Sequence, residues 1–316
     1  MIKEIEEAAS VINSFVKPTP LLESKHLNSL ISGRLFLKTE NLQPTGSFKL
    51  RGALNAISKL SEHQLKNGVL AYSSGNHAIG VAFAAKCLGT KATVIIPKDI
   101  PRKKLEAIQS FNTEIIFYDR KIDNREDIGK KVCLQRDLNL IKPYDDIDTI
   151  CGQGTCGVEI IKQIDTSIDS AIICTGGGGF AAGLGSYLKN KFPHINIFTA
   201  EPIGWDDHKL SFENKRRVTC IKANEGICDG VMTPTPGELT FEINMKNNAS
   251  GLAVAEDIIL KAMQIVYKEF NFKLEPSGAV ALACVLDNKK IFQGQNVLVT
   301  LSGGNVDEEK FADCFI

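Results

Sequence analysis

Short apolar runs alternate with longer segments of helical spacing along nearly the whole chain. The short runs predict strands over residues 35–38, 69–72, 92–96, 114–118, 171–174, 195–200 and 296–301. The longer segments predict helices over residues 2–15, 47–59, 77–88, 102–110, 125–137, 157–163, 256–269 and 276–286. Strands that alternate with helices pair in parallel, because a helix crosses over between them. The pattern therefore predicts an α/β fold with open, twisted, mainly parallel sheets and helices on both faces.

The alternation is most compact between residues 68 and 145, where three strand–helix units follow one another closely. We predict that residues 68–145 form a small, mobile domain, inserted into a large domain made of residues 1–67 and 146–316. In open parallel sheets, ligands bind at the carboxyl ends of the strands. The functional site is therefore expected where strand ends from both domains meet.

Composition excludes several classes of protein. The 316 residues carry 37 basic and 37 acidic side chains with no basic stripe, so nucleic acid is not an expected partner. No apolar run is long enough to span a membrane, and the acidic N-terminus is unlike a signal peptide. Nine scattered cysteines without a CxxC pair indicate a reducing compartment, and we expect a cytoplasmic protein.

Lys49 lies in an unusual position for a lysine that only interacts with solvent at the protein surface. Pro44 and Gly46 predict a turn, and Ser47 stands where the N-cap of the next helix is expected. Lys49 would then lie in the first helical turn, where the helix dipole disfavours an ammonium group. A lysine held partly neutral is a nucleophile, and imines with carbonyl cofactors are among its main catalytic uses.

Two polar turns lie between a predicted strand and a predicted helix. Residues 73–77, Ser-Ser-Gly-Asn-His, bring backbone N–H groups and hydroxyls together, as in a carboxylate site or in a helix capped by Ser74. The second turn contains four successive glycines, which allow the main chain to wrap a phosphate at a helix N-terminus. These are Gly176, Gly177, Gly178 and Gly179.

Three more glycine-flanked polar turns lie at predicted element ends, at residues 152–155, 275–279 and 300–305. The first is expected to begin the helix near Gly157. Turn chemistry explains each one singly. Together, the five turns predict one site assembled from distant segments.

The motifs Pro-Thr-Gly-Ser-Phe-Lys, Ser-Ser-Gly-Asn-His, the glycine loop and Leu-Ser-Gly-Gly-Asn, in that order, resemble the fold type II pyridoxal-phosphate enzymes. The likeness is greatest to the serine/threonine dehydratase and serine racemase branch, and it extends from about residue 17 to residue 305. It implies a tryptophan synthase β-like fold, a homodimer, and a large domain that binds pyridoxal phosphate (PLP).

The resemblance also implies roles for individual residues. Lys49 would form the imine with PLP, Phe48 would pack by the ring, and Asn76 would bind the ring's phenolic oxygen. The four glycines would bind the phosphate, and Ser302 would face the pyridine nitrogen. The substrate carboxylate would lie among Ser73, Ser74, Asn76 and His77, and Ser74 would be catalytic on the substrate's opposite face.

A serine beside the pyridine nitrogen is a neutral partner, so the site favours prompt loss of a β-substituent or prompt reprotonation. We expect Lys49 to remove the α-proton of L-serine or L-threonine, after which the β-hydroxyl leaves and hydrolysis gives a 2-oxo acid and ammonia.

Two alternative functions would use the same residues. With Ser74 as second acid/base, the protein would be a serine racemase with side eliminase activity. With Arg125 binding a second carboxylate, it would be a hydroxyaspartate dehydratase.

Residues near 201–207 provide a candidate metal site. The resemblance implies Glu201, the Trp205 carbonyl and Asp207 as ligands, and such oxygen ligands suit Mg²⁺ or Ca²⁺. A strand end followed by an acidic capping turn is the alternative interpretation.

An NAD-dependent oxidoreductase is the alternative from another class. Gly176, Gly178 and Ala181 match a dinucleotide fingerprint after a strand, and Glu201 ends the next strand, where a ribose-binding acid is expected. This interpretation leaves Lys49 and the turn at 73–77 unexplained.

Overall fold

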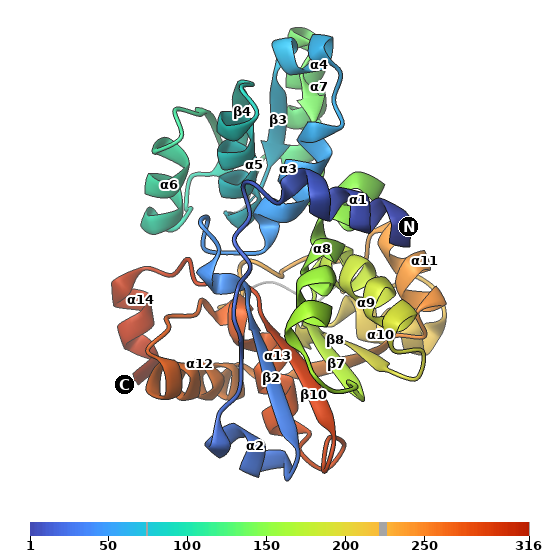
Figure 1. Ribbon diagram of the computed structural model, residues 1–316. Coiled ribbons are helices and arrows are strands. Elements are labelled where there is room, and N and C mark those ends of the chain that lie inside the picture. The colour runs from blue at the N-terminus through green and yellow to red at the C-terminus, as the bar shows by residue number, and fades with distance from the viewer. Residues whose placement is uncertain (74, 221–225, 316) are drawn as a thin grey trace.

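The computed structural model describes residues 1–73, 75–220 and 226–315, and these form two sheets covered by helices (Figure 1). The larger sheet has six strands in the order β1-β2-β10-β7-β8-β9. Their bounds are β1 (Leu21–Leu22), β2 (Arg34–Thr39), β10 (Asn296–Leu301), β7 (Ser170–Cys174), β8 (Asn196–Pro202) and β9 (Ser250–Val254). Every neighbouring pair is parallel except β1 with β2.

The smaller sheet has four parallel strands in the order β5-β4-β3-β6. They are β5 (Glu114–Tyr118), β4 (Ala92–Pro97), β3 (Val69–Tyr72) and β6 (Asn139–Leu140), all within residues 68–145. The predicted class, α/β with two mainly parallel sheets, is therefore confirmed. The two-residue strands β1 and β6, and β9, were not predicted, because such short or polar runs give little periodic signal.

Helices cover both sheets (Figure 1). Around the smaller sheet lie α3 (Lys49–Ser58), α4 (Glu62–Asn67), α5 (Asn76–Cys87), α6 (Arg102–Gln109) and α7 (Arg125–Arg136). The others are α1 (Ile2–Ile12), α2 (Lys25–Ile31), α8 (Ile147–Gln163), α9 (Gly179–Lys191), α10 (Asp207–Asn214), α11 (Glu238–Lys246), α12 (Glu256–Phe270), α13 (Pro276–Asp287) and α14 (Glu308–Ala312), with short 3₁₀ turns η1 (Glu40–Leu42) and η2 (Asp313–Phe315).

The apolar core under the smaller sheet includes side chains from before residue 68. Ile12 and Leu50 pack in one cluster with Val69 and Val94 of the sheet. Helix α3 thus belongs to the packing of the smaller sheet although Lys49 begins it, and α3 also packs on α8. The domain boundaries at residues 68 and 145 stay a prediction.

Helix α8 begins earlier than the sequence predicts, at Ile147, where the Asp146 side chain accepts a hydrogen bond of 2.9 Å from the Thr149 N–H. The turn expected at residues 152–155 therefore lies inside a helix. Its glycines allow close helix packing, since a Cβ on Gly152 would lie 2.5 Å from the Arg51 carbonyl oxygen of α3. Glycine here reflects the approach of two backbones, and the prediction of a turn was wrong.

A buried ion network lies beneath α3. Arg51, 1% exposed, donates to both oxygens of Glu40 at 2.7 and 2.8 Å and forms an ion pair with Glu159 at 2.8 Å. Burial alone would raise the pKa of Glu40, but Arg51 lowers it to about 2. The network fixes the helix that carries Lys49, because a charge left unpaired at this depth would be costly.

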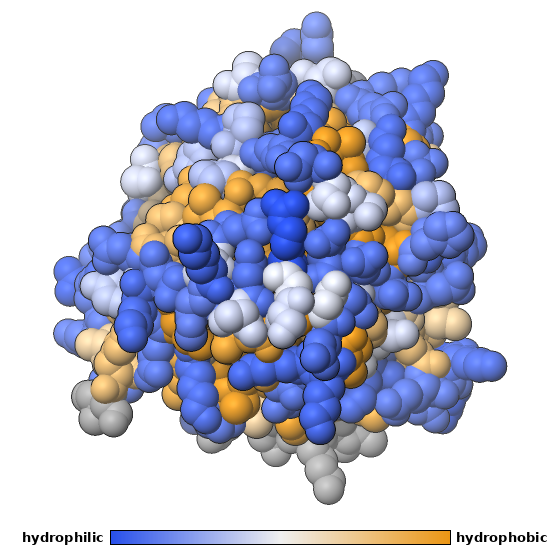
Figure 2. Space-filling model, turned by 60° about the horizontal axis from the view of Figure 1, so that its bottom comes forward, coloured by the Kyte–Doolittle hydropathy of each residue, from blue (hydrophilic) through white to orange (hydrophobic). Residues whose placement is uncertain are grey.

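The surface shown in Figure 2 is mainly hydrophilic, with apolar patches between the polar side chains. Within the described ranges, no helix combines the length and apolar character needed to cross a membrane. All nine cysteines are free thiols. The predicted homodimer and compartment are not tested by these observations.

Candidate active site

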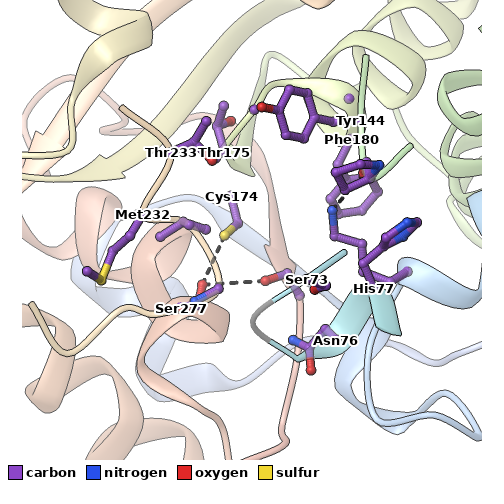
Figure 3. A pocket seen from close by; sticks show the side chains of 18 of the residues that line it. Ser73, Asn76, His77, Tyr144, Cys174, Thr175, Phe180, Met232, Thr233 and Ser277 are labelled. Atoms are coloured by element: carbon purple, nitrogen blue, oxygen red, sulfur yellow. Dashed lines mark hydrogen bonds between the residues drawn. The ribbon is translucent and has the colours of Figure 1, made fainter. Parts of the chain in front are cut away.

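Most of the residues singled out in the sequence line one cavity between the two sheets. Helix α3 contributes Lys49, α5 contributes Asn76 and His77, and the end of β10 contributes Ser302. The remaining predicted residues that line this cavity are Phe48, Ser73, Gly176, Gly177, Gly178 and Gly179. Ser74 lies outside the described residues. Figure 3 shows how Ser73, Asn76 and His77 lie across from Cys174 and Thr175.

Backbone pairing brings Lys49 next to Ser302. Ser47 forms an isolated antiparallel bridge with Gly303, and the Phe48 N–H donates to the Ser302 carbonyl at 3.3 Å. Helix α3 therefore begins at Lys49, and Ser47 is not its N-cap as predicted, because its backbone continues the pairing with the end of β10. Gly46 allows this turn, since its φ is +70°.

Lys49 lies in surroundings that hold its amine partly neutral. The Lys49 Nζ donates to the Pro143 carbonyl oxygen at 2.9 Å, and burial lowers the lysine's pKa to about 8. Burial also lowers the pKa of His77 to about 3, so this ring is neutral, and its Nε2 lies 2.8 Å from the Ile141 carbonyl oxygen. An amine with such a pKa is available as nucleophile and base near neutral pH.

The glycine loop forms a bare backbone cradle at the N-terminus of α9. Gly178 has φ +94°, and a Cβ there would lie 2.5 Å from the His208 ring. A Cβ on Gly177 would lie 2.3 Å from the ring of Tyr144, which covers the loop. The chain therefore requires glycine at these positions, and backbone N–H groups at a helix N-terminus attract an anion such as phosphate.

Ser302 lies among neutral donors. Its hydroxyl donates to the Ser277 carbonyl at 3.4 Å, and the Cys174 thiol donates to the same oxygen at 2.9 Å (Figure 3). Burial raises the pKa of Cys174 to about 12, so the thiol stays protonated. This side of the cavity therefore offers hydroxyl and thiol groups to a ligand.

Asn76, the first residue of α5, has both ends of its amide bound. Its Nδ2 donates to Glu275 Oε1, and its Oδ1 accepts from Asn305 Nδ2 at 2.9 Å. The turns at residues 275–279 and 300–305 thus meet at this amide, as the sequence predicted for a common site. Of the five predicted turns, only that at 152–155 lies away from the cavity.

Some residues that line the cavity were not predicted from the sequence, and one was named there only for an alternative substrate. Asp229, Met232 and Thr233 line the cavity from the irregular chain before α11, where no periodicity identifies them. Arg125 is half-buried at the start of α7, and its guanidinium lies 5.8 Å from the centre of the Tyr72 ring. No carboxylate in the described part of the chain forms an ion pair with Arg125. A second positive group thus faces the cavity.

The candidate metal ligands are not among the residues that line the cavity. Glu201 accepts from the N–H groups of His208 and Lys209, each at 2.9 Å. Both oxygens of the buried Asp207 lack hydrogen-bond partners among the described residues. Burial raises the pKa of Glu201 and of Asp207, and the Asp207 charge raises that of Glu201 further. The residues present fit a cation, because an unpartnered buried carboxylate requires compensation.

Glu201 does not line the cavity. Its carboxylate is directed to the first turn of α10, so it does not face a nucleotide bound at the glycine loop. The dinucleotide fingerprint is present as a strand–loop–helix, but its ribose-binding acid is engaged elsewhere. Within the described residues, no group of three or more His, Cys, Asp or Glu side chains forms a metal cluster.

Known proteins resemble this chain over almost its whole length. The model of the family "Pyridoxal-phosphate dependent enzyme" matches residues 12–303. L-threo-3-hydroxyaspartate ammonia-lyase of Saccharomyces cerevisiae is 35% identical over 309 residues, 98% of this chain and 94% of that protein. A catabolic L-threonine dehydratase of Staphylococcus aureus is 36% identical over 96% of this chain and 88% of its own. The crystal structure of serine racemase from Dictyostelium discoideum superimposes with a TM-score of 0.90 and 37% identity, over 97% of this chain and 99% of that one.

Proposed function

The chain belongs to the family of pyridoxal-phosphate dependent enzymes, and from this premise we propose that it is an ammonia-lyase that dehydrates L-threonine, L-serine or both to a 2-oxo acid. The observation that carries the proposal is Lys49, whose pKa is lowered to about 8 in a cavity that also contains the glycine loop and Ser302. A nucleophilic amine, an anion cradle and a neutral hydroxyl in one cavity match the needs of this chemistry.

The residues present fit PLP. The cradle at Gly176–Gly179 suits its phosphate, because these glycines bring backbone N–H groups to the N-terminus of α9 without side chains of their own. Asn76 would bind the ring oxygen and Ser302 would face the ring nitrogen, which their common place in the cavity lining supports. Phe48, stacked on Phe180 with centroids 4.1 Å apart, would pack by the ring. When bound, PLP supplies an electron sink that stabilises charge at the substrate's α-carbon.

The chain's own groups would then orient the substrate and move its protons. The N-terminus of α5 with Ser73, Asn76 and His77 would hold the α-carboxylate, and the neutral fraction of Lys49 would accept the α-proton. Ser302 donates a hydrogen bond but carries no charge, so the site stabilises a long-lived carbanion poorly. Loss of the β-hydroxyl is therefore favoured over slower reactions.

A second candidate substrate is L-threo-3-hydroxyaspartate. Arg125 supports it, because this half-buried guanidinium lines the cavity without a carboxylate partner among the described residues. A β-carboxylate would supply that partner through a charge-assisted hydrogen bond. Relatives with this activity are as similar to the chain as the dehydratases.

One substrate panel separates these possibilities. Purified protein with PLP is given L- and D-serine, L- and D-threonine and 3-hydroxyaspartate, and the 2-oxo acid and the opposite enantiomer are both measured. We expect 2-oxo acid from L-threonine or L-serine, and none from Lys49→Ala. Arg125→Met should reduce kcat/KM for 3-hydroxyaspartate alone if that is the substrate. A Lys49→Ala protein as active as the wild type would refute the proposal.

Racemisation stays an alternative outcome of the same panel. Ser74 would be its second acid/base, so inversion of L-serine that disappears in Ser74→Ala, with elimination retained, would assign a serine racemase activity. The relative from Dictyostelium discoideum supports this test.

The proposal includes a divalent cation, a homodimer and a cytoplasmic location. Glu201, the Trp205 carbonyl and Asp207 would hold Mg²⁺ or Ca²⁺, which the two unpartnered oxygens of Asp207 support. The nine free thiols support a reducing compartment. Sedimentation of the purified protein tests the dimer.

A further inference from the structure

Lys104 of α6 is one of the largest fully buried side chains in the described part of the molecule, although it is a lysine. Its Nζ forms ion pairs with Asp229 at 2.8 Å and with Glu275 Oε2 at 2.9 Å. Helix α6 flanks the smaller sheet, whereas Glu275 directly precedes α13, which packs on the larger sheet (Figure 1). Lys104 therefore links a helix of the smaller sheet to the segment before α13 of the larger sheet, at the edge of the cavity.

A directed series of hydrogen bonds continues from this ion pair into the site. The Thr45 carbonyl oxygen can only accept a hydrogen bond, so the atom of the Asn305 amide that faces it must be the donor Nδ2. The two atoms lie 2.9 Å apart. The same Nδ2 donates to Asn76 Oδ1 at 2.9 Å, which places the Asn76 Nδ2 on the side of Glu275. Glu275 accepts from that Nδ2, and an ionised carboxylate is an acceptor only. Each group thus has one role.

The consequence concerns the second hydrogen of the Asn76 amide. One N–H is bound by Glu275, and the other remains on a side chain that lines the cavity. A protonated Glu275 could also donate a hydrogen bond. Either the nitrogen or the oxygen of the Asn76 amide could then face it, and Glu275 would no longer fix the orientation of the amide. Burial does raise the pKa of Glu275, and Lys104 is the main group that opposes this rise.

We propose that Lys104 is a positioning residue: by keeping Glu275 ionised, it holds the Asn76 amide with one N–H directed at the ring oxygen of bound PLP. Because Lys104 lies on α6 and Glu275 directly precedes α13, this ion pair couples the position of α6 to the orientation of the amide. Gly75 permits this approach, because a Cβ there would lie 2.4 Å from Lys104 Cδ. The inference rests on the proposed function, since it requires PLP in the cavity.

The test compares absorption spectra of the PLP-bound protein. A hydrogen bond to the ring oxygen favours the visible-absorbing tautomer of the bound cofactor, so its loss should enlarge the near-ultraviolet band at the expense of the visible one. In Lys104→Met we expect the ratio of visible to near-ultraviolet absorbance to fall about tenfold, the size of one lost hydrogen bond to a charged group. Lys104→Gln, which retains more of the side chain's polarity, is measured in parallel in case Lys104→Met does not fold.

Controls separate positioning from packing. Arg102→Met changes a cation of the same helix whose side chain is 87% exposed and pairs within the helix, and its spectrum should equal the wild type's. Lys104→Arg should restore most of the visible band. If Lys104 acts through Glu275, adding Lys104→Met to Glu275→Gln should change the ratio less than twofold beyond Glu275→Gln alone.

The outcomes distinguish this inference from the proposed function. A wild-type protein that gains no visible band with PLP would overturn both. A yellow wild type whose folded Lys104→Met and Lys104→Gln variants keep the wild-type absorbance ratio would overturn the role of Lys104 only. Additive effects of the Lys104 and Glu275 substitutions would likewise refute action through Glu275.

Discussion

The lowered pKa of Lys49 has a direct kinetic consequence for capture of PLP by the cofactor-free protein. Only the neutral amine attacks an aldehyde, and burial shifts the pKa from 10.5 to about 8. A difference of about 2.5 pKa units corresponds to about 300-fold more neutral amine at neutral pH. We therefore expect the rate of capture to rise about tenfold per pH unit below pH 8 and to level off above it.

Groups that face Lys49 should not distort this profile. The pKa of His77 is lowered to about 3, while those of Cys174 and Tyr144 are raised to about 12, so none of them titrates between about pH 6 and pH 10. The pKa of Glu275 is also raised, and this carboxyl lines the same cavity. The Glu275→Gln protein is therefore the control, and it should show the same midpoint.

The assay is stopped-flow absorbance after PLP is mixed with cofactor-free protein across this pH range. N-acetyl-lysine amide serves as the unperturbed amine, and Lys49→Ala should show no capture at the site. A rate that continues to climb tenfold per unit from pH 8 to beyond pH 10 would show that the protein leaves this amine unperturbed. The assignment of Lys49 as a partly neutral nucleophile would then be wrong.

Three further predictions follow from buried groups. Glu40→Gln should lower the free energy of unfolding by about 3–5 kcal/mol in urea titrations, because it leaves the Arg51 charge without its main partner; a loss below about 1 kcal/mol would contradict this. The contribution of ionised Glu40, whose pKa falls from 4.5 to about 2, is fully present above about pH 4.5 and is lost as pH falls through about 2. The Cys174 thiol, with its pKa raised to about 12, should resist iodoacetamide at about pH 8 in the folded protein and react in denaturant, as mass spectrometry would show; rapid labelling in the folded state would refute it. Finally, Mg²⁺ or Ca²⁺ at about one hundred times its Kd should add about 2.7 kcal/mol of stability. The double variant Glu201→Gln, Asp207→Asn should lose this stabilisation, and an unchanged cation effect would exclude these ligands.

The sequence by itself determined the parts of this protein that depend on local periodicity and backbone freedom. The strands β3, β5 and β10 were predicted with the bounds that the structure shows, because each is a short apolar run bounded by polar or glycine residues. The glycine loop was identified because four glycines at a strand–helix junction have few other uses. The polar turns were grouped by their places at element ends, and the roles of Lys49 and Ser302 toward a cofactor came from resemblance to a known family.

Only the tertiary structure decided which charged groups are buried and what each one faces. The sequence at Lys104 shows a cation in a basic helix, and only the approach of α6 to Glu275 and Asp229 makes it an interior ion pair. Gly152 is a turn signal in the sequence, yet the crossing of α3 and α8 places it inside a helix. These properties depend on contacts between residues far apart in the chain, and pairwise distances of that kind leave no periodic trace in a single sequence.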